Sequence, residues 1–502
     1  WNDFTVAATA GASFTKEVTH GTYLNAEGDQ YYEVDVTDAN GITYKMPQGN
    51  VYFPNIFHRD NYYDIYYQEN YTKKRLNSVF GTLQLGYKDM VYLDLTARND
   101  WSSALAFTES MSFFYPSVGA TFLLDEMFHM NDDLFDMVKL RASYSVVGND
   151  IPAYYSRPVA TLSKLTITLP TVMPFTDWKP EKTFSIEAGF DLAMLHNRLR
   201  TEFTFYKANT KNQYFQVSAP VASGYSKRNI NAGNVENLGI EASVSYRLDF
   251  NHDWSWTPGI NFSYNKNEIK ELCPGLEEYN LAEASAFIMK LKKGGSYGDI
   301  YTYDFQYDDN GNIKLDNTGA PLLTSDADTY AGNFNSKFHL GWSNTINWKN
   351  LNIYALVDGK IGGKVLSMTE AIMDGYGVSK ATGDARLNGG VPNKDGSMID
   401  AEKYYSRVGG RAQNAGFNAM EYMYSATNFR LRELSVGYTF ENLFGMNKNL
   451  TASVVGRNLF FLYKKSPCDP DISGSTGNGW QGIDVFSLPA TRSWGLNLKL
   501  NF

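Results

Sequence analysis

The feature that most constrains this chain is an alternation of apolar and polar side chains that returns in segment after segment. In the last eleven residues, RSWGLNLKLNF, one face of an extended strand is wholly apolar and the other is polar. A period of two with such different faces predicts a strand that lies between two solvents. An aromatic residue at the last apolar position is typical of the closing strand of an outer-membrane barrel. The apolar face carries Trp494, Leu496, Leu498, Leu500 and Phe502.

The same alternation recurs elsewhere, and in each strand the charges fall only on the polar face. A soluble sandwich alternates in the same way, so a single strand does not distinguish the two folds. We expect the apolar faces to point to lipid and the charged faces into a lumen. A lysine or arginine on the lipid face would cost about 2–4 kcal/mol at the bilayer midplane. The segments are 91–98, 183–192, 240–248 and 432–440, and the expected lumen charges include Asp94, Arg98, Glu241, Arg247 and Glu433.

The composition excludes several classes of protein. No run of about 18 apolar residues occurs, so the sequence predicts no transmembrane helix, and a spanning barrel escapes hydropathy because half of each strand is polar. A net charge of −9 argues against binding of nucleic acid. Two cysteines in 502 residues rule out a disulfide scaffold and a cysteine-rich metal site. Because the chain starts at Trp1 without a signal peptide, we expect a processed product or a fragment.

The alternation gives about fourteen candidate strands, an even number of the kind that bacterial barrels prefer. Their connections alternate between short and long. Tight turns are expected at Lys88-Asp89, His196-Asn197 and Lys349-Asn350 on the periplasmic side, with every long segment outside the cell. The strands are expected to begin near Phe4, Lys73, Met90, Phe113, Val138, Thr183, Arg198, Val235, Trp254, Phe334, Leu351, Ser425, Lys448 and Arg492. The long segments are roughly 18–72, 148–182, 215–234, 271–333, 363–424 and 464–491.

These observations predict an all-β fold, a transmembrane antiparallel β-barrel with long extracellular loops and short periplasmic turns. Within one loop, Asn310-Gly311 predicts a hairpin turn. The alternation of Asp308, Asn310 and Asn312 matches part of the ligand pattern of a calcium-binding loop. A turn is nevertheless favoured over a metal site, because Gly311 stands at position four instead of position six.

No residue pattern predicts catalysis. The six histidines lack metal-ligand spacing, and neither HExxH nor G-x-S-x-G occurs. We therefore expect no catalytic residue, no metal and no cofactor. Cys273 and Cys468 both fall in segments assigned to the outside, where a disulfide is chemically permitted, but nothing in the sequence brings these segments together.

Aromatic residues in the long segments are the candidates for ligand contact. The run NYYDIYYQENY carries Tyr66 and Tyr67, which could stack on sugar rings or face a partner, or could simply pack the loop against its neighbours. Trp480 is flanked by glycines in GNGWQG, which favours exposure and makes it the preferred candidate. Trp178, between Asp177 and Lys179, is a similar candidate. Tryptophans near strand ends, such as Trp254 and Trp348, are most simply anchors at the membrane interface.

Several segments, taken in order, resemble the C-terminal barrel of the SusC/RagA family of TonB-dependent outer-membrane transporters. Residues 92–103 followed by Tyr115-Pro116-Ser117 resemble that family's strand ending in R-x-D-x-S before a YPS strand. Residues 234–241, NVENLGIE, are similar to its N-x-G-x-E pattern. The remaining similar segments are Gly332–Phe338, Asn428–Arg432 with Gly437-Tyr438, Gly456–Phe460, Asp469-Pro470-Asp471 and Leu488–Arg492.

The resemblance implies a larger barrel of about 22 strands with a plug domain inside it. Residues 1–502 would then be the C-terminal part of that barrel, without the plug and the first strands. It also implies a SusD-like surface lipoprotein at the extracellular mouth, energy from the TonB complex acting on the plug, and import of oligosaccharides or oligopeptides. No bond of the substrate is broken, so the chain is not expected to be an enzyme.

Two other classes of protein remain open from the residues alone. One is a self-sufficient passive channel of about fourteen strands, and the other is an outer-membrane adhesin. The sequence identifies neither the substrate nor the oligomeric state.

Overall fold

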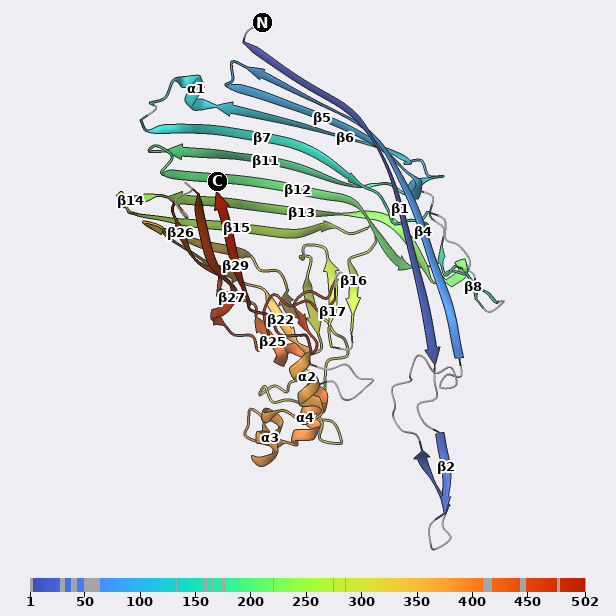
Figure 1. Cartoon of the computed structure of the whole chain (residues 1–502). Coiled ribbons are helices and arrows are strands. Elements are labelled where there is room, and N and C mark those ends of the chain that lie inside the picture. Colours follow the sequence, from blue (N-terminus) through green and yellow to red (C-terminus); the bar gives the residue numbers. More distant parts are fainter. Residues whose placement is uncertain are drawn as a thin grey trace.

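One long antiparallel sheet forms the body of the molecule (Figure 1). Within the described residues, fourteen strands follow one another along a single hydrogen-bonded path, as the alternation predicts. The computed structural model describes residues 3–27, 32–37, 43–48, 64–131, 133–156, 161–163, 166–168, 170–173, 175, 177–219, 221–273, 275–284, 286–409, 418–442, 448–475 and 479–501. The strands of the path are β1 Phe4–Glu27, β4 Asp64–Tyr87, β5 Val91–Ser102, β6 Ser112–Leu123, β7 Phe135–Asn149, β11 Glu181–Met194, β12 Leu199–Ser218, β13 Lys227–Tyr246, β15 Trp254–Glu271, β20 Phe338–Trp348, β21 Leu351–Ile361, β26 Asn428–Phe440, β27 Asn449–Lys464 and β29 Ser493–Asn501.

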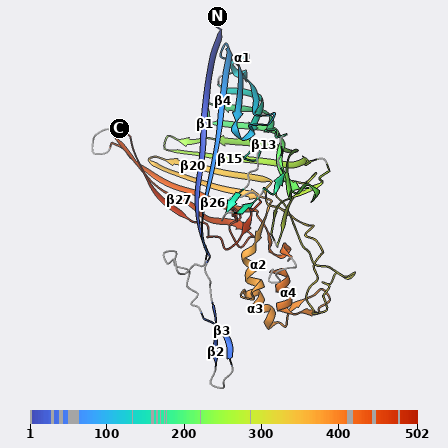
Figure 2. The same ribbon diagram turned by 90° about the vertical axis from the view of Figure 1, so that its right-hand side faces the viewer.

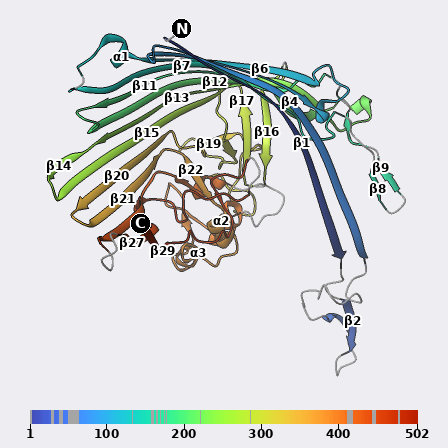
Figure 3. The same ribbon diagram turned by 45° about the horizontal axis from the view of Figure 1, so that its top comes forward.

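The sheet curves strongly but stays open (Figure 3). Each strand of the path pairs antiparallel with the next one, and β1 and β29 form the two edges. Among the described residues these two edge strands do not pair with each other.

The two faces of the sheet differ as the alternation predicts. On β15, Ile260 lies on the apolar face with 54% of its surface exposed, and its neighbour Asn261 lies on the opposite, polar face. The register aligns Ile260 with Val244 of β13 and Trp342 of β20, so the apolar face continues across strands. The apolar side chains of the edge strand β29 are likewise exposed, namely Trp494, Leu496, Leu498 and Leu500. A continuous exposed apolar belt is what a lipid-facing surface requires.

The short connections form tight turns at one end of the sheet. Lys88 and Asp89, which join β4 to β5, have positive φ angles of 50° and 54°. His196 and Asn197 have φ angles of 58° and 59° between β11 and β12. Positive φ values match the twist of antiparallel hairpins, so these predicted turns are confirmed. Lys349, in the third predicted turn, has a φ angle of 50°, and two of the other connections carry helix α1, Leu124–Phe128, and strand β14, Leu248–Asn251.

The long connections contain more regular structure than their sequences suggest. The described parts of three of them, residues 275–284 with 286–336, 362–409 with 418–427, and 465–475 with 479–492, pack together into what we call the loop lobe (Figures 1 and 2). Its core includes Phe287, Leu366 and Ile483, one residue from each connection, and all three are buried. Its elements are β16 Glu278–Glu283, β17 Ile288–Lys292, β18 Asp299–Thr302, β19 Thr329–Asn333, β22 Lys364–Ser367, α2 Met368–Gly375, α3 Lys380–Leu387, β23 Val391–Pro392, β24 Met398–Ile399, α4 Ala401–Val408, the 3-10 helix Ala419–Tyr422, β25 Met423–Ser425 and β28 Ile483–Asp484.

Smaller elements occupy the other long connections. Strand β2, Tyr32–Thr37, pairs with β3, Thr43–Gln48, beyond the end of the β1–β4 hairpin. The remaining elements are β8 Thr161–Ser163, β9 Thr166–Thr168, β10 Val172–Met173 and two 3-10 helices, Ser103–Leu105 and Val221–Ser223.

Two predicted strand starts are wrong in the same way. Strand β4 begins at Asp64 instead of near Lys73, and β13 begins at Lys227 instead of near Val235. A tilted membrane span takes about 9–11 residues, whereas β1 and β4 have 24 residues each. The backbone ladder therefore continues beyond the membrane, where the strict alternation is no longer required.

Other expectations concern the loops and the helices. The turn at Asn310-Gly311 is confirmed, because the Gly311 N–H donates to the Asp308 carbonyl at 3.0 Å and Gly311 has a φ of 82°. Neither Cys273 nor Cys468 is in a disulfide. No helix in the part of the chain that the structure describes is long and apolar enough to cross a membrane.

The two-faced sheet makes a direct prediction for β15. Ile260→Arg should lower the free energy of unfolding by about 2–4 kcal/mol, because it puts a charge against the hydrocarbon near the middle of the span. Asn261→Arg, the matched control one residue later on the polar face, should change it by less than about 0.5 kcal/mol. Urea unfolding of the native protein in lipid vesicles measures both values. Equal costs for the two variants would contradict the assignment of the faces.

Candidate functional site

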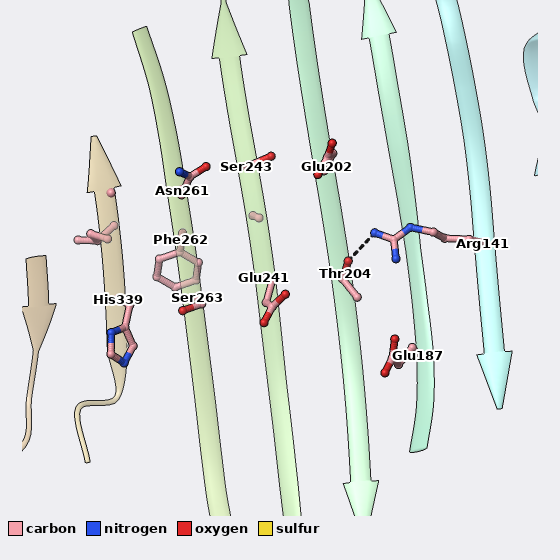
Figure 4. Close-up of a pocket in the computed structure, with 13 residues that line it drawn as sticks. Arg141, Glu187, Glu202, Thr204, Glu241, Ser243, Asn261, Phe262, Ser263 and His339 are labelled. Atoms are coloured by element: carbon pink, nitrogen blue, oxygen red, sulfur yellow. Dashed lines mark hydrogen bonds between the residues drawn. The ribbon is translucent and has the colours of Figure 1, made fainter. Parts of the chain in front are cut away.

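The inner face of the sheet carries a row of charged side chains at mid-height (Figure 4). Arg141 of β7 donates through Nε to Asp191 at 3.2 Å and through Nη2 to Thr204 at 2.7 Å. Lys139 lies 2.6 Å from the other oxygen of Asp191. Lys139 and Arg141 thus share the single carboxylate of Asp191.

Three carboxylates beside this cluster are left without a cation. Glu187, Glu202 and Glu241 come from β11, β12 and β13, and none forms an ion pair with another described residue. With Arg141, Asn261 and His339 they line an open hollow of about 590 Å³ (Figure 4). The middle of the wall therefore presents negative charge to whatever passes it.

A second hollow, of about 760 Å³, lies where β7, β11, β12, β13 and β15 leave the membrane toward the loops. We call it the mouth chamber. Its floor is apolar and closed, since Phe215, Ile269 and Leu291 are 6%, 0% and 5% exposed. Its remaining lining is rich in amides and tyrosines: Asn149, Gln213, Gln216, Asn229, Asn237, Asn265, Asn267, Asn335, Tyr155, Tyr214, Tyr279 and Tyr297.

Asparagine side chains hold a loop of the lobe against the chamber. Asn267 of β15 donates to Asn237 at 2.9 Å and accepts the backbone N–H of Tyr297 at 2.7 Å. Asn335 donates to the carbonyl of Tyr297 at 2.7 Å. Tyr297 is therefore fixed from both sides, which gives the chamber a set shape.

The aromatic rings form a connected group at the chamber wall. Tyr155 and Tyr214 meet edge to face with centroids 5.8 Å apart. Trp178 packs against both rings at 6.4 Å and 6.5 Å, and against Phe175 at 5.1 Å. Tyr214 and Tyr155 keep 42% and 38% of their surfaces exposed, so they present open ring surface.

The last long loop is fastened to the wall by a cluster that we call the clasp. Arg430 of β26 is 3% exposed and donates to Asp469 from two nitrogens at 3.3 Å each. It also contacts Asp471, which accepts from Lys360 of β21 at 2.5 Å. The Phe461 ring lies 4.6 Å below the guanidinium. Fork-shaped arginine contacts of this kind fix orientation as well as charge.

Burial opposes ionisation of Asp471, but Lys360, Arg430 and Arg432 outweigh it and hold the pKa of this carboxyl below its ordinary value. The carboxylate therefore stays charged, and the clasp stays closed, over the physiological pH range.

Two sequence motifs prove to be structural fasteners. Arg98 donates to Asp100 at 2.8 Å, to Tyr115 at 3.0 Å and to Ser78 at 2.7 Å, so it ties β4, β5 and β6 together. Ser102 caps the following 3-10 helix by accepting from the Ala104 N–H at 3.2 Å. These residues build the wall and do not face an open space, because Asp100 and Ser102 are buried.

Gly239 belongs to the other motif, in β13, and is required by a close approach. A Cβ added there would lie 2.3 Å from the ring of Tyr206 on β12 and 2.6 Å from the Tyr264 carbonyl oxygen. The ring of Tyr206 lies directly over the Cα of Gly239, and only glycine, which has no side chain, leaves room for the ring.

The predicted ligand-contact residues are not gathered in one place. Trp480 is half-buried and meets Phe287 edge to face at 5.8 Å, within the core of the loop lobe. Trp178 is 1% exposed and supports the chamber from behind. Tyr66 and Tyr67 belong to β4, but their side chains lie outside the described part of the structure. Ligand contact by any of the four stays a prediction.

The chamber residues were missed by reading the sequence. Their one signal in the sequence is the high density of amide side chains where the strands leave the membrane. Amide side chains are not expected on the lipid-facing side of a membrane strand. The residues that carry this signal are Asn209, Asn212, Gln213, Asn231, Asn234, Asn237, Asn265 and Asn267.

The described residues offer little for metal chemistry. Among them, no group of three or more His, Cys, Asp or Glu side chains is arranged to hold a metal ion. Asp308 accepts from the backbone N–H groups of Asn310 and Asn312 at 2.9 and 2.8 Å, which is the geometry of a turn.

Comparison with known proteins gives a consistent relationship. A family model described as "TonB dependent receptor-like, beta-barrel" matches residues 1–355. TonB-dependent receptor P3 of Formosa agariphila is 25% identical over 470 residues, covering 85% of this chain and 45% of that protein. TonB-dependent receptor SusC of Bacteroides thetaiotaomicron is 23% identical over 469 residues, covering 86% and 44%. The chain spans about half the length of the curated relatives it matches.

The same comparison holds for solved structures. The RagAB peptide importer in its "open-open" state matches with a TM-score of 0.74 and 19% identity, covering all of this chain and 53% of that one. A second structure, described as the RagAB peptide transporter, gives a TM-score of 0.73 and 20% identity, covering 100% of this chain and 54% of that one. At this identity the likeness shows a common fold.

The clasp predicts that the last long loop is released in acid. Because the pKa of Asp471 is lowered, its contribution is complete above the ordinary value of about 3.9 and is lost as the pH falls through the lowered pKa. The protection factors of the amides of residues 465–475, which correct for the slower intrinsic exchange in acid, should therefore fall by about ten-fold or more below about pH 4. Asp471→Asn should exchange fast already at pH 7, whereas Asp253→Asn, in an exposed pair with Lys349, should not. Unchanged exchange in Asp471→Asn would contradict the clasp.

Proposed function

The chain belongs to the TonB dependent receptor-like β-barrel family of the outer membrane, and from this membership we propose that it forms the wall of a nutrient importer. The imported molecules are oligosaccharides or oligopeptides, and the import depends on TonB. The single observation that carries the proposal is the polar face of β15, whose Asn261 and Ser263 line the charged hollow at mid-height and whose next residues on that face, Asn265 and Asn267, line the mouth chamber. A molecule with many hydrogen-bonding groups can exchange water for wall contacts along such a face.

We propose further that residues 1–502 are the C-terminal part of a larger barrel of about 22 strands that also holds a plug domain. The open sheet supports this idea, because the edges of β1 and β29 leave backbone N–H and C=O groups unpaired. Each such group costs several kcal/mol in lipid, so the edges need further strands or each other. The relatives are about twice as long as this chain, which leaves room for those parts.

The partners follow from the same proposal. A SusD-like lipoprotein would cover the loop side, where exposed apolar side chains stand on the loop lobe: Tyr376, Val378 and Leu387 are 66%, 69% and 87% exposed. The TonB complex would act through the plug. The relatives are receptors and transporters rather than enzymes, and transport breaks no bond in the substrate.

Composition of the native protein is the first test. Purification from outer membranes in mild detergent, followed by intact-mass measurement of the denatured components, should yield a polypeptide about twice the 56.5 kDa of this chain, or this chain with a separate N-terminal piece. A lipoprotein should accompany it. A 56.5 kDa species found alone would instead favour a self-sufficient channel.

Energy dependence separates the importer from the two other classes of protein. Uptake of a labelled oligosaccharide or peptide mixture by living cells should stop when a protonophore collapses the inner-membrane gradient, because a plugged barrel opens only under force. A passive channel would continue to transport in the presence of the protonophore. An adhesin would show no uptake that deletion of the gene removes.

A further inference from the structure

The mouth chamber has a chemical character narrow enough to identify its ligand. We propose that it is a binding site for an uncharged segment of an oligosaccharide and that it rejects polyanionic glycans. This inference rests on the proposed import function and names the charge class of the substrate and the residues that select it.

The polar groups of the chamber are neutral, and several are available. The side chains of Asn149 and Gln213 form no hydrogen bond with another described residue. Asn237 accepts through Oδ1 from Asn265 at 3.3 Å and from Asn267 at 2.9 Å, so its NH2 group is left to donate. Amides offer both donors and acceptors, which matches sugar hydroxyls that also do both.

The aromatic groups supply the second half of sugar recognition. Tyr214 and Tyr155 present exposed ring surface at the chamber wall, and the buried Trp178 behind them fixes their positions. The C–H face of a pyranose packs on such a surface while its equatorial hydroxyls reach the neighbouring amides. Rings that are held in place lose little side-chain entropy when a ligand binds.

The charges set the class of sugar. Glu181 is the one charged residue of the chamber lining that the structure describes, and no lysine, arginine or histidine lines it. Two neighbouring cations are already paired: Lys74 with Asp150 at 2.5 Å, and Lys207 with Glu236 at 2.9 Å. A sulfated or uronic-acid segment would lose hydration beside Glu181 without gaining a counter-charge, and would then meet the three carboxylates at mid-height.

A peptide fits this lining less well. Its terminal carboxylate would find no cation in the chamber, and its apolar side chains would find no pocket because Phe215, Ile269 and Leu291 are closed beneath the surface. The observations therefore favour the neutral sugar, and peptide binding becomes an outcome of the test.

Binding to the native protein tests the proposal without any transport. The complete complex, purified from outer membranes, would be titrated calorimetrically with three kinds of probe. The neutral probes are maltohexaose, cellohexaose, mannohexaose and xylohexaose. The anionic probe is oligogalacturonate, and the peptide probe is hexa-alanine. At least one neutral probe should bind, and oligogalacturonate and hexa-alanine should bind at least about ten-fold more weakly.

Variants of the chamber assign the binding to it. Tyr214→Ala should weaken the neutral probe about ten-fold, whereas Tyr87→Ala, at the turn end of β4 and 41% exposed against 42% for Tyr214, should leave it unchanged. Glu181→Lys should improve binding of oligogalacturonate with little effect on the neutral probe. Glu126→Lys in the periplasmic helix α1 is its control for net charge. Resistance of each variant to unfolding in cold SDS shows that the barrel has formed.

Failure of this inference is distinguishable from failure of the proposed function. Tighter binding of oligogalacturonate or hexa-alanine, or a neutral affinity that Tyr214→Ala leaves intact, overturns the assignment of the chamber. Gradient-dependent uptake in cells would still stand in each of these cases. Absence of any binding by the neutral probes likewise overturns the inference.

Discussion

Every backbone N–H and C=O group inside the bilayer must be paired within the protein, and this requirement governs the structure. Between its two open edges, β1 and β29, the described part of the chain meets it with fourteen strands that each bond to the next, several of them joined by turns whose residues have positive φ. Once the backbone is satisfied by the ladder, the side chains are free to differ between faces. The outer face becomes apolar around Ile260, and the inner face carries Glu187, Glu202 and Glu241.

The loops depend on the same ladder, since strand ends provide the side chains that hold them. Asn267 at the end of β15 fixes Tyr297, and Arg430 at the start of β26 fixes the loop through Asp469 and Asp471. Both anchors sit on rigid strands, so the segments they hold take defined positions over the opening. The mouth chamber is thus a product of the wall as much as of the loops.

The sequence predicts the wall well because the period of two is strict where lipid demands it. It places the ends of β4 and β13 poorly, since polar residues are tolerated on both faces once a strand leaves the membrane. The amide-rich strand ends are the only sequence signal of the mouth chamber, and they do not show which residues line it together. Tyr155, Tyr214 and Tyr297 lie far apart in the chain, and they line one chamber only when the strands are paired and the connections are docked on them. The sequence predicts the clasp only in part. The segments NFRLR and DPD are recognisable motifs, but the contact between them depends on the register of β21, β26 and β27.

The loop lobe has a consequence for the order in which the molecule is made. Its core joins Phe287, Leu366 and Ile483, which lie on three connections separated by whole strands. Contacts of such long sequence separation are slow to form, and here each connection must first reach the same side of the membrane. The lobe can therefore close its core only after the strands from β15 to β27 have crossed. A closed lobe core on the outside of the cell therefore indicates that the last third of the wall has been assembled.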